Sequence, residues 1–173
     1  MDAQEMIWRS PLVSAIFISL RIHHRSKVAE VIEIMFSEAI ECRNEGDLQR
    51  SSEILLDIVS KYEGDSRLIT VYTVLGGVLF DQSRFIESLH YYKKAQALNR
   101  GLEIVSLGIY LNYVELERYD EAIAEMDQYL TCYHADAYLI TLKELLGDLK
   151  NGFARDHESV IVKWARKYNV LLY

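Results

Sequence analysis

The strongest constraint on the fold of this 173-residue chain is an internal repeat with a period of 34 residues. The segment 83–89 (Ser-Arg-Phe-Ile-Glu-Ser-Leu) is followed 34 residues later by a similar segment at 117–123 (Glu-Arg-Tyr-Asp-Glu-Ala-Ile). Similarity at a fixed spacing of this length is typical of arrays in which each repeat is one helix–turn–helix unit. The period therefore predicts a stack of helix pairs rather than a generic helical bundle.

Apolar residues recur at three- and four-residue steps along most of the chain, as they do on the buried stripe of a helix. No segment combines the two-residue period of a strand with flanking hairpin turns. Short polar or glycine-containing breaks separate the helical stretches, so we expect about eight helices of roughly 12 to 19 residues. At three breaks a side-chain oxygen can cap the next helix, namely at Asp47, Ser66 and Ser83.

The pattern of large and small residues resembles the tetratricopeptide repeat (TPR) family over residues 30–134. Small residues such as Gly76 and Ser88 stand where the two helices of a pair are expected to cross, although Tyr110 replaces the small residue in the next unit. The proline that usually closes a repeat is absent. The family positions are filled by Met35, Ala39, Cys42, Ser51, Leu55 and Ile58, then by Tyr72, Leu75, Gly76, Leu79, Ser88, Tyr92 and Ala95, and then by Ser106, Ile109, Tyr110, Tyr113, Ala122, Met126 and Tyr129.

This resemblance implies an all-α fold, a solenoid of about three helix–turn–helix repeats within one domain that spans residues 1–173. Helices on either side are expected to flank the repeats. One is an N-terminal helix at 12–24, and the other element is a C-terminal capping helix pair at 137–168.

Composition and charge exclude several classes of protein. The formal net charge of −7 argues against a nucleic-acid partner. Cys42 and Cys132 are too far apart in sequence for a zinc motif, and we expect both to be unreactive core thiols on apolar helical stripes. The longest apolar run, 11–20, is shorter than the roughly 20 residues of a membrane-spanning helix and lacks the flanks of a signal peptide. We therefore expect a cytoplasmic protein without a membrane partner.

No known motif for catalysis, nucleotide binding or metal binding occurs in the sequence. His23 and His24 are adjacent, so their side chains diverge on a helix and cannot easily share a metal. The run Asp156-His157-Glu158 is expected to be a solvated helix start. The prediction is a protein that is not an enzyme and has neither a cofactor nor a metal site.

The remaining candidate for function is a binding surface, because the first helices of stacked pairs line the concave side of such an array. Helical phase predicts a largely apolar groove without the ordered lysine and asparagine residues by which chaperone-binding TPR proteins clamp a C-terminal carboxylate. The groove can take a partner helix or strand, or the chain's own helix 12–24, which would leave no room for a peptide. The candidate groove residues are Thr73, Val74, Gly77, Phe80, Leu107 and Leu111, and the same phase places Gly108 beside them.

Negative charge is concentrated in residues 106–139, which hold seven acidic residues and one basic residue, Arg118. Glu117, Glu121 and Glu125 recur at four-residue steps and are expected to share one solvated helix face. Such a face speeds association with a basic partner, and the alternative is that it serves solubility alone. The candidate contact residues are Glu115, Glu117, Asp120, Glu121, Glu125 and Asp127.

A narrower resemblance covers residues 102–110, 117–126, 129–130 and 141–146. These segments are similar to small bacterial TPR proteins that act as immunity partners of polymorphic or contact-dependent toxins. Such proteins bind one toxin domain and block it, and many of those domains are basic nucleases, which would account for an acidic binder. The resemblance implies a bacterial cytoplasmic immunity protein.

Two other functions remain open at this point. The chain can be a TPR chaperone of the type III secretion class, which should have an open groove for an extended client segment. It can also be a general scaffold or adaptor, and a homodimer is compatible with each of the three functions.

Overall fold

The computed structural model describes residues 11–65 and 67–170, with side chains from residue 27 onward. All regular secondary structure in this part of the chain is helical, which confirms the predicted all-α class. The helices are α2 (Pro11–Asn44), α3 (Leu48–Lys61), α4 (Leu68–Asp81), α5 (Phe85–Leu98), α6 (Glu103–Glu115), α7 (Tyr119–Cys132), α8 (Tyr138–Lys150), the short 3-10 helix η1 (Arg155–His157) and α9 (Glu158–Lys167).

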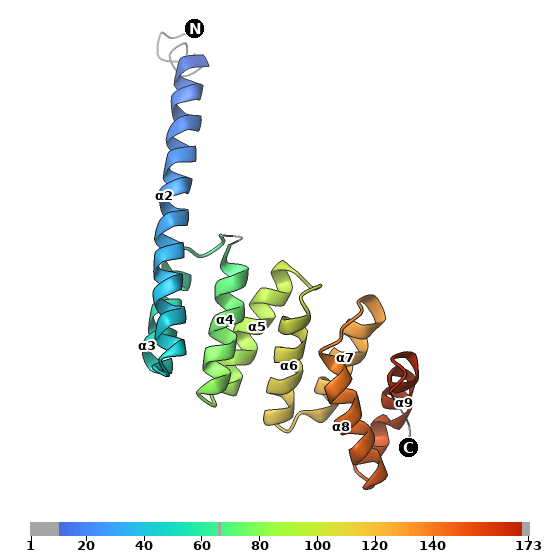
Figure 1. Cartoon of the computed structure of the whole chain (residues 1–173). Coiled ribbons are helices and arrows are strands. Elements are labelled where there is room, and N and C mark those ends of the chain that lie inside the picture. Colours follow the sequence, from blue (N-terminus) through green and yellow to red (C-terminus); the bar gives the residue numbers. More distant parts are fainter. Residues whose placement is uncertain (1–10, 66, 171–173) are drawn as a thin grey trace.

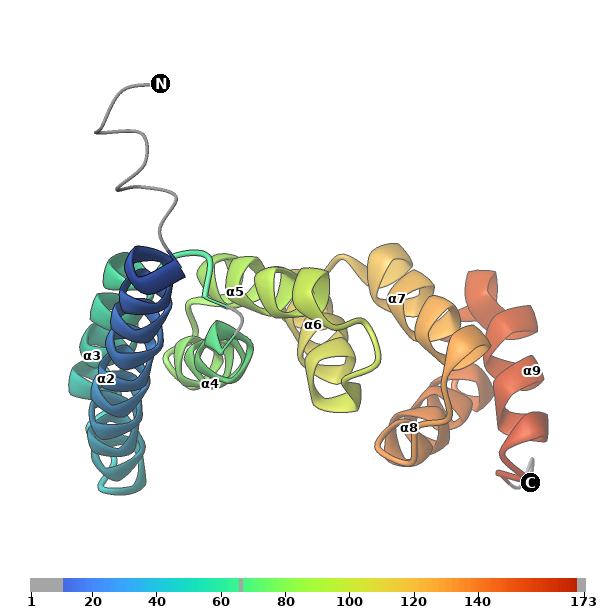
Figure 2. The same cartoon turned by 90° about the horizontal axis from the view of Figure 1, so that it is seen from above.

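Consecutive helices pack in pairs, α2 with α3, α4 with α5, α6 with α7 and α8 with α9 (Figure 1). The pairs stack side by side along the molecule, so that α3 packs on α4 and α5 packs on α6. Seen from above, the first helices α4, α6 and α8 lie on one side of the stack and the second helices α5 and α7 lie on the other (Figure 2). This arrangement is the elongated, solenoid-like stack that the 34-residue period predicts.

The first helix of every pair ends in the same kind of turn. One residue in each turn has a left-handed backbone, with φ of 88° at Gly46, 60° at Ser83, 58° at Glu117 and 86° at Gly152. The next residue then donates its backbone N–H to a carbonyl five positions earlier, over 2.8–2.9 Å. This is the hydrogen-bonding pattern of a Schellman helix end. The pair at 137–168, predicted as a cap, therefore closes its first helix as the three predicted repeats do.

The structure tests two of the three predicted helix caps. Asp47 accepts a hydrogen bond from the backbone N–H of Arg50 at 2.9 Å, as expected of an N-cap. The prediction for Ser83 is wrong, because Ser83 is the left-handed residue of the turn and α5 starts after Arg84 without a side-chain cap. Ser66 lies outside the described residues.

Small residues lie where the helices of a pair cross, as predicted. The hydroxyl of Ser51 donates to the carbonyl of Ala39, and that of Ser88 donates to the carbonyl of Gly76, each at 2.7 Å. All four residues are buried. The same hydrogen bond occurs in the first and second pairs, so the two pairs can be aligned on it. In this alignment each residue of the first pair corresponds to the residue 37 positions later in the second pair.

The N-terminal helix differs from the prediction. Residues 12–24 do not form a separate flanking helix but continue directly into the first helix of the stack, giving α2 a length of 34 residues rather than the expected 12 to 19. The reason is local, since the chain has neither glycine nor proline between Pro11 and Gly46, and a proline is tolerated in the first turn of a helix. Figure 1 shows the N-terminal part of α2 extending beyond the pairs, so it does not fill the groove.

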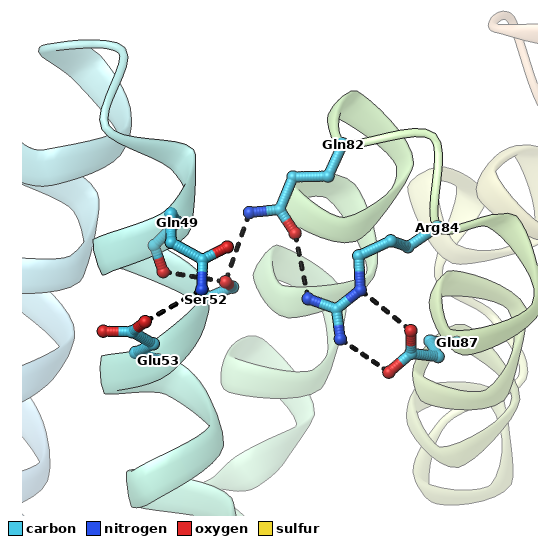
Figure 3. Close-up of polar contacts among 6 residues, drawn as sticks. All are labelled: Gln49, Ser52, Glu53, Gln82, Arg84 and Glu87. Carbon is cyan, nitrogen blue, oxygen red and sulfur yellow. Dashed lines mark hydrogen bonds and ion pairs between the residues drawn. The ribbon is translucent and has the colours of Figure 1, made fainter.

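Polar side chains connect the first and second pairs, as Figure 3 shows. Gln82, in the turn after α4, donates to the buried hydroxyl of Ser52 on α3 at 3.2 Å. Arg84 donates to Gln82 at 3.1 Å and holds Glu87 through two hydrogen bonds of 2.8 and 2.6 Å. Because these groups satisfy one another, we regard the junction as structural rather than as a candidate site.

Among the side chains that the structure describes, the buried ones form two clusters rather than one continuous core. The first cluster is built by α2, α3, α4, α5 and the inner side of α6, and the second by α6, α7, α8 and α9. Helix α6 belongs to both, with Ile109 in the first cluster and Tyr110 in the second. The core is therefore divided at α6, the first helix of the third pair, while the third and fourth pairs share the second cluster.

Candidate functional site

Within the described residues, no three His, Cys, Asp or Glu side chains converge in a way that could hold a metal ion. Partial burial and the nearby carboxylates of Asp47 and Glu38 raise the pKa of the Cys42 thiol, in keeping with the expectation that it is unreactive. The expectation that Cys132 belongs to the core is wrong, because Cys132 is exposed at the end of α7.

The predicted groove residues lie on two adjacent first helices, α4 and α6, which contact each other. The side chains on α4 are half-buried and pack within the chain. The hydroxyl of Thr73 donates to the carbonyl of Ile69 at 2.8 Å, and the ring of Phe80 meets that of Phe85 edge-on. Gly77 faces the hydroxyl of Tyr92. Val74 and Leu107 are likewise half-buried, and Leu111 is 38% exposed.

Gly108 does not lie in the groove, contrary to the prediction from helical phase. It is buried in α6 against the ring of Tyr92 from α5, closer than a Cβ atom would allow. The reason is that helix-to-helix packing between successive pairs uses this side of α6, which phase alone does not distinguish from the groove.

The prediction that Glu117, Glu121 and Glu125 share one solvated face is wrong for Glu125. Its side chain is 5% exposed and joins three helices. The carboxylate accepts hydrogen bonds from Gln96 at 2.7 Å and Ser106 at 2.9 Å, and pairs with Lys93 at 3.2 Å. A buried carboxylate with this many partners is a structural tie between α5, α6 and α7.

The other candidate acidic residues fall into two groups. Asp127 is used internally, because it accepts from the indole N–H of Trp164 at 2.6 Å and pairs with Lys163 at 2.8 Å, linking α7 to α9. Glu121 is paired with Arg118 at 2.6 Å. The remaining three acidic candidates are exposed and lie at the end of α6 and the start of α7. We call this group the acidic turn, and it consists of Glu115, Glu117 and Asp120.

Beside the acidic turn, a cleft of about 590 Å³ opens between the third and fourth pairs. Its walls come from the C-terminal half of α6, the first turns of α7, the later part of α8 and the connector that leads through η1 to α9. This connector is longer than its counterparts. The second helix starts two residues after the left-handed residue in the first three pairs, but six residues after Gly152 in the fourth.

The cleft has an apolar floor and a polar, aromatic rim. Tyr110, Ile123 and Leu145 line the floor and are at most 9% exposed. At the rim, the side chains of Tyr119 and Phe153 are exposed by 56% and 67%. Three carboxylates and two nitrogen-bearing side chains complete the rim, namely Asp120, Asp148, Asp156, Arg155 and His157.

The electrostatic environment of the cleft is negative. Burial, together with the negative charges of Glu144 and Asp148, raises the pKa of Tyr110 at the floor to about 12. Asp120 lies 3.1 Å from the ring nitrogen Nε2 of His157, and this contact connects α7 to the long connector. Among the described residues, no basic side chain pairs with Asp148 or Asp156. The rim therefore presents carboxylates that remain available to a basic partner.

The opposite end of the same junction is closed by hydrogen bonds. The hydroxyls of Ser106 and Tyr138 lie 2.9 Å apart, and Glu103 accepts from the backbone N–H of Ala137. The backbone N–H of Ala135 donates to the hydroxyl of Tyr168 at 2.9 Å. These contacts hold the pairs together at one end, which leaves the cleft at the other.

The cleft was not predicted from the sequence, although two features that form it, Tyr110 and the segment 156–158, are visible there. Tyr110 stands where the first and second pairs have the small residues Ala39 and Gly76, and its ring meets that of Tyr138 edge-on at a centroid distance of 5.8 Å. The segment 156–158 was expected only to begin a helix, and α9 does begin there, but Asp156 and His157 also line the cleft. The sequence feature that indicates the cleft is the length of the connector after Gly152. Its additional length can be recognised only when the turns of all four pairs are aligned.

Comparisons with known proteins add no relative. No family model matches the sequence, and no curated protein matches it. The likeness to TPR proteins therefore stays a resemblance of pattern. Within the described residues, no helix has both the length and the apolar character that crossing a membrane requires.

Proposed function

We propose that this chain is a protein-binding helical-repeat module, without catalytic activity of its own, that binds a basic partner through the cleft and the acidic turn. The observation that carries the proposal is the cleft rim, where the exposed rings of Tyr119 and Phe153 stand beside carboxylates. Aromatic residues are enriched in protein interfaces, and an acidic surface steers a basic partner toward it.

In its specific form, the proposal is an immunity protein that binds and neutralises one toxin domain. Support comes from the segments that resemble TPR immunity proteins, because α6, α7 and α8 contain those segments and also supply three walls of the cleft. A basic nuclease domain would match the carboxylates of the rim. An inhibitor of this kind needs a tight contact with one partner and no active site.

The test begins with affinity capture of the tagged chain from its native host and identification of the bound protein by mass spectrometry. The purified partner is then titrated against the chain, and association rates are measured at two salt concentrations. A variant with Asp120→Asn, Asp148→Asn and Asp156→Asn should associate about tenfold more slowly at low salt, because rim carboxylates act mainly on the encounter rate. The partner's enzymatic activity should be lost in the complex.

The matched control removes the same charge far from the cleft, through Glu41→Gln, Glu45→Gln and Glu63→Gln in and after the first pair. It should leave the association rate within about twofold of that of the wild type. Equal slowing by both triple variants would mean that net charge rather than the cleft sets the rate. A partner that keeps full activity in the complex would argue against an immunity function.

One observation favours the secretion-chaperone alternative. The N-terminal part of α2 extends away from the stack, so residues 12–24 do not cover the side of the stack that α4 and α6 form. A chaperone of this kind would hold an extended client segment there. Leu111→Glu, on an exposed position of α6, should then weaken client binding more than the triple amide variant does.

A further inference from the structure

The floor of the cleft is suited to an apolar group from another molecule. Its volume of about 590 Å³ lies within the roughly 300–1,000 Å³ of ligand pockets. Tyr110, Ile123 and Leu145 make its base largely hydrophobic. A side chain of the size of leucine or tryptophan can occupy it and be desolvated there, as interface anchors are.

The rim is suited to positive charge on either side of that group. Asp120 comes from α7, Asp148 from α8 and Asp156 from the long connector, so carboxylates surround the mouth on several elements. Arg155 is the one basic side chain with a permanent charge among the lining residues, and its guanidinium lies beside Gly152. Lysine or arginine residues that enter with an apolar anchor would therefore meet an excess of negative charge.

Two exposed rings stand at the same mouth, Tyr119 on α7 and Phe153 on the connector. Aromatic faces attract lysine ammonium and arginine guanidinium groups, and they also add apolar area around an anchor. Phe153 follows Gly152 as Asp47, Arg84 and Arg118 follow the left-handed residues of the other turns, and the four additional residues of this connector, 154–157, come directly after it and also line the cleft. The insertion that breaks the repeat thus supplies a wall of the cleft.

We propose that this cleft is the anchor pocket for a partner segment in which one apolar side chain is flanked by lysine or arginine. This inference rests on the proposed protein-binding function and specifies the chemistry of the segment. The apolar side chain occupies the floor between Tyr110 and Leu145, and the flanking cations pair with the rim carboxylates.

The test uses three peptides with acetyl and amide ends, Lys-Trp-Lys, Glu-Trp-Glu and Lys-Gly-Lys, each titrated into the ¹⁵N-labelled full chain while amide chemical shifts are followed. Lys-Trp-Lys should shift the amides of the connector around Gly152 and Phe153. It should half-saturate at a concentration at least about threefold lower than the other two, because exposed ion pairs are individually weak and the anchor adds apolar burial. Equal binding of Glu-Trp-Glu or Lys-Gly-Lys, or shifts located elsewhere, would overturn the inference.

A pair of variants gives a second readout. Phe153→Ser should weaken binding of Lys-Trp-Lys at least about threefold, because it removes an exposed ring from the mouth. Ile86→Ser, a comparably exposed apolar position on α5, is the control and should leave the titration unchanged. Equal effects of the two variants would contradict a site at the cleft.

Failure of this inference can be distinguished from failure of the proposed function. A captured partner that binds the wild type, Phe153→Ser and the triple amide variant with equal affinity would overturn the anchor pocket and leave protein binding intact. The absence of any specific partner would count against the proposed function itself.

Discussion

At the scale of single residues, the ring of Tyr92 shows how tightly successive pairs are packed. It lies between Gly76 of its own pair and Gly108 of the next pair, and it is 7% exposed. A Cβ atom at Gly76 would lie 2.8 Å from ring carbon Cδ2. Because glycine is present on both sides, the ring cannot move away from an added atom without meeting the other helix.

Replacing Gly76 with alanine should therefore destabilise the protein by about 1–3 kcal/mol, despite the higher helix propensity of alanine. Urea denaturation followed by circular dichroism measures the change. The matched control is Gly147→Ala in α8, where an added Cβ meets nothing within 4 Å. The control should stabilise the protein by about 0.5–1 kcal/mol. Stabilisation by both substitutions would contradict the packing of Tyr92.

Asp127 shows that the chain uses acidic residues for internal contacts. The hydrogen bond from Lys163 lowers the pKa of its carboxyl group, with a further contribution from the indole of Trp164 and in spite of partial burial. A carboxyl group whose pKa is lowered by folding stabilises the native state above its unfolded pKa of about 4. That contribution is lost as the pH falls through the lowered value.

We therefore predict that wild type loses more stability than Asp127→Asn between pH 5 and pH 3. The urea midpoints of wild type and Asp127→Asn, measured at several pH values, should converge as the pH falls, because the wild-type carboxylate becomes protonated. Glu63→Gln, at an exposed position, is the control and should follow the wild-type pH dependence. A constant difference between wild type and Asp127→Asn would show that the ion pair with Lys163 does not contribute.

At the scale of helices, the serine hydrogen bonds of the first two crossings define the pair as the unit of construction. Ser51 and Ser88 each come from the second helix and each donate to the first helix twelve residues earlier. The third pair has Ala122 and Tyr110 at these positions, so it lacks the bond and carries a large ring instead. This substitution lies at the floor of the cleft, where the stack is least regular.

Ser88→Ala should cost about 1 kcal/mol, the usual contribution of one intramolecular hydrogen bond. Thermal or urea denaturation measures it. Ser60→Ala on the surface of α3 removes a hydroxyl that also donates to a helix carbonyl, at 2.9 Å, but in an exposed place. The control should change stability by less than about 0.5 kcal/mol. Similar costs for both would mean that burial of the hydroxyl does not matter.

At the scale of the whole molecule, the first pair, at the end of the stack, is more exposed than the pair that follows it. Val31 and Ile34 on α2 are 42% and 63% exposed. Their counterparts 37 residues later, Leu68 and Val71, are 0% and 2% exposed, because α3 of the preceding pair packs on α4. Exposure at one end thus follows from position in the stack and not from residue type.

Leu68→Ala should therefore destabilise the protein by about 2–5 kcal/mol, as expected for a buried leucine. Val31→Ala, at the corresponding position of the first pair, should change the free energy of unfolding by less than about 0.5 kcal/mol. Both are read from urea denaturation of the full chain. A large cost for Val31→Ala would mean that this face of α2 is covered in solution.

The sequence alone was sufficient for the fold class, the short turns and the crossing at Gly76. These features depend on interactions within a helix or between neighbouring helices of one pair, and those repeat along the chain with a visible period. The glycine at the crossing could be recognised because the spacing of large and small residues around it resembles that of the TPR family. The prediction of an all-α solenoid is confirmed for the same reason.

Only the tertiary structure decided which polar residues are accessible and where the stack opens. Helical phase places Glu125 and Glu121 on one face, but the neighbouring helices bury Glu125 and leave Glu121 at the surface. The cleft likewise depends on the ring of Tyr110 and on a connector that begins at Gly152, which lie far apart in the sequence. The period of apolar residues indicates which side of a single helix is buried. Whether a polar residue such as Glu125 is buried, and where a cleft opens, depends on the distances between helices, which that period does not specify.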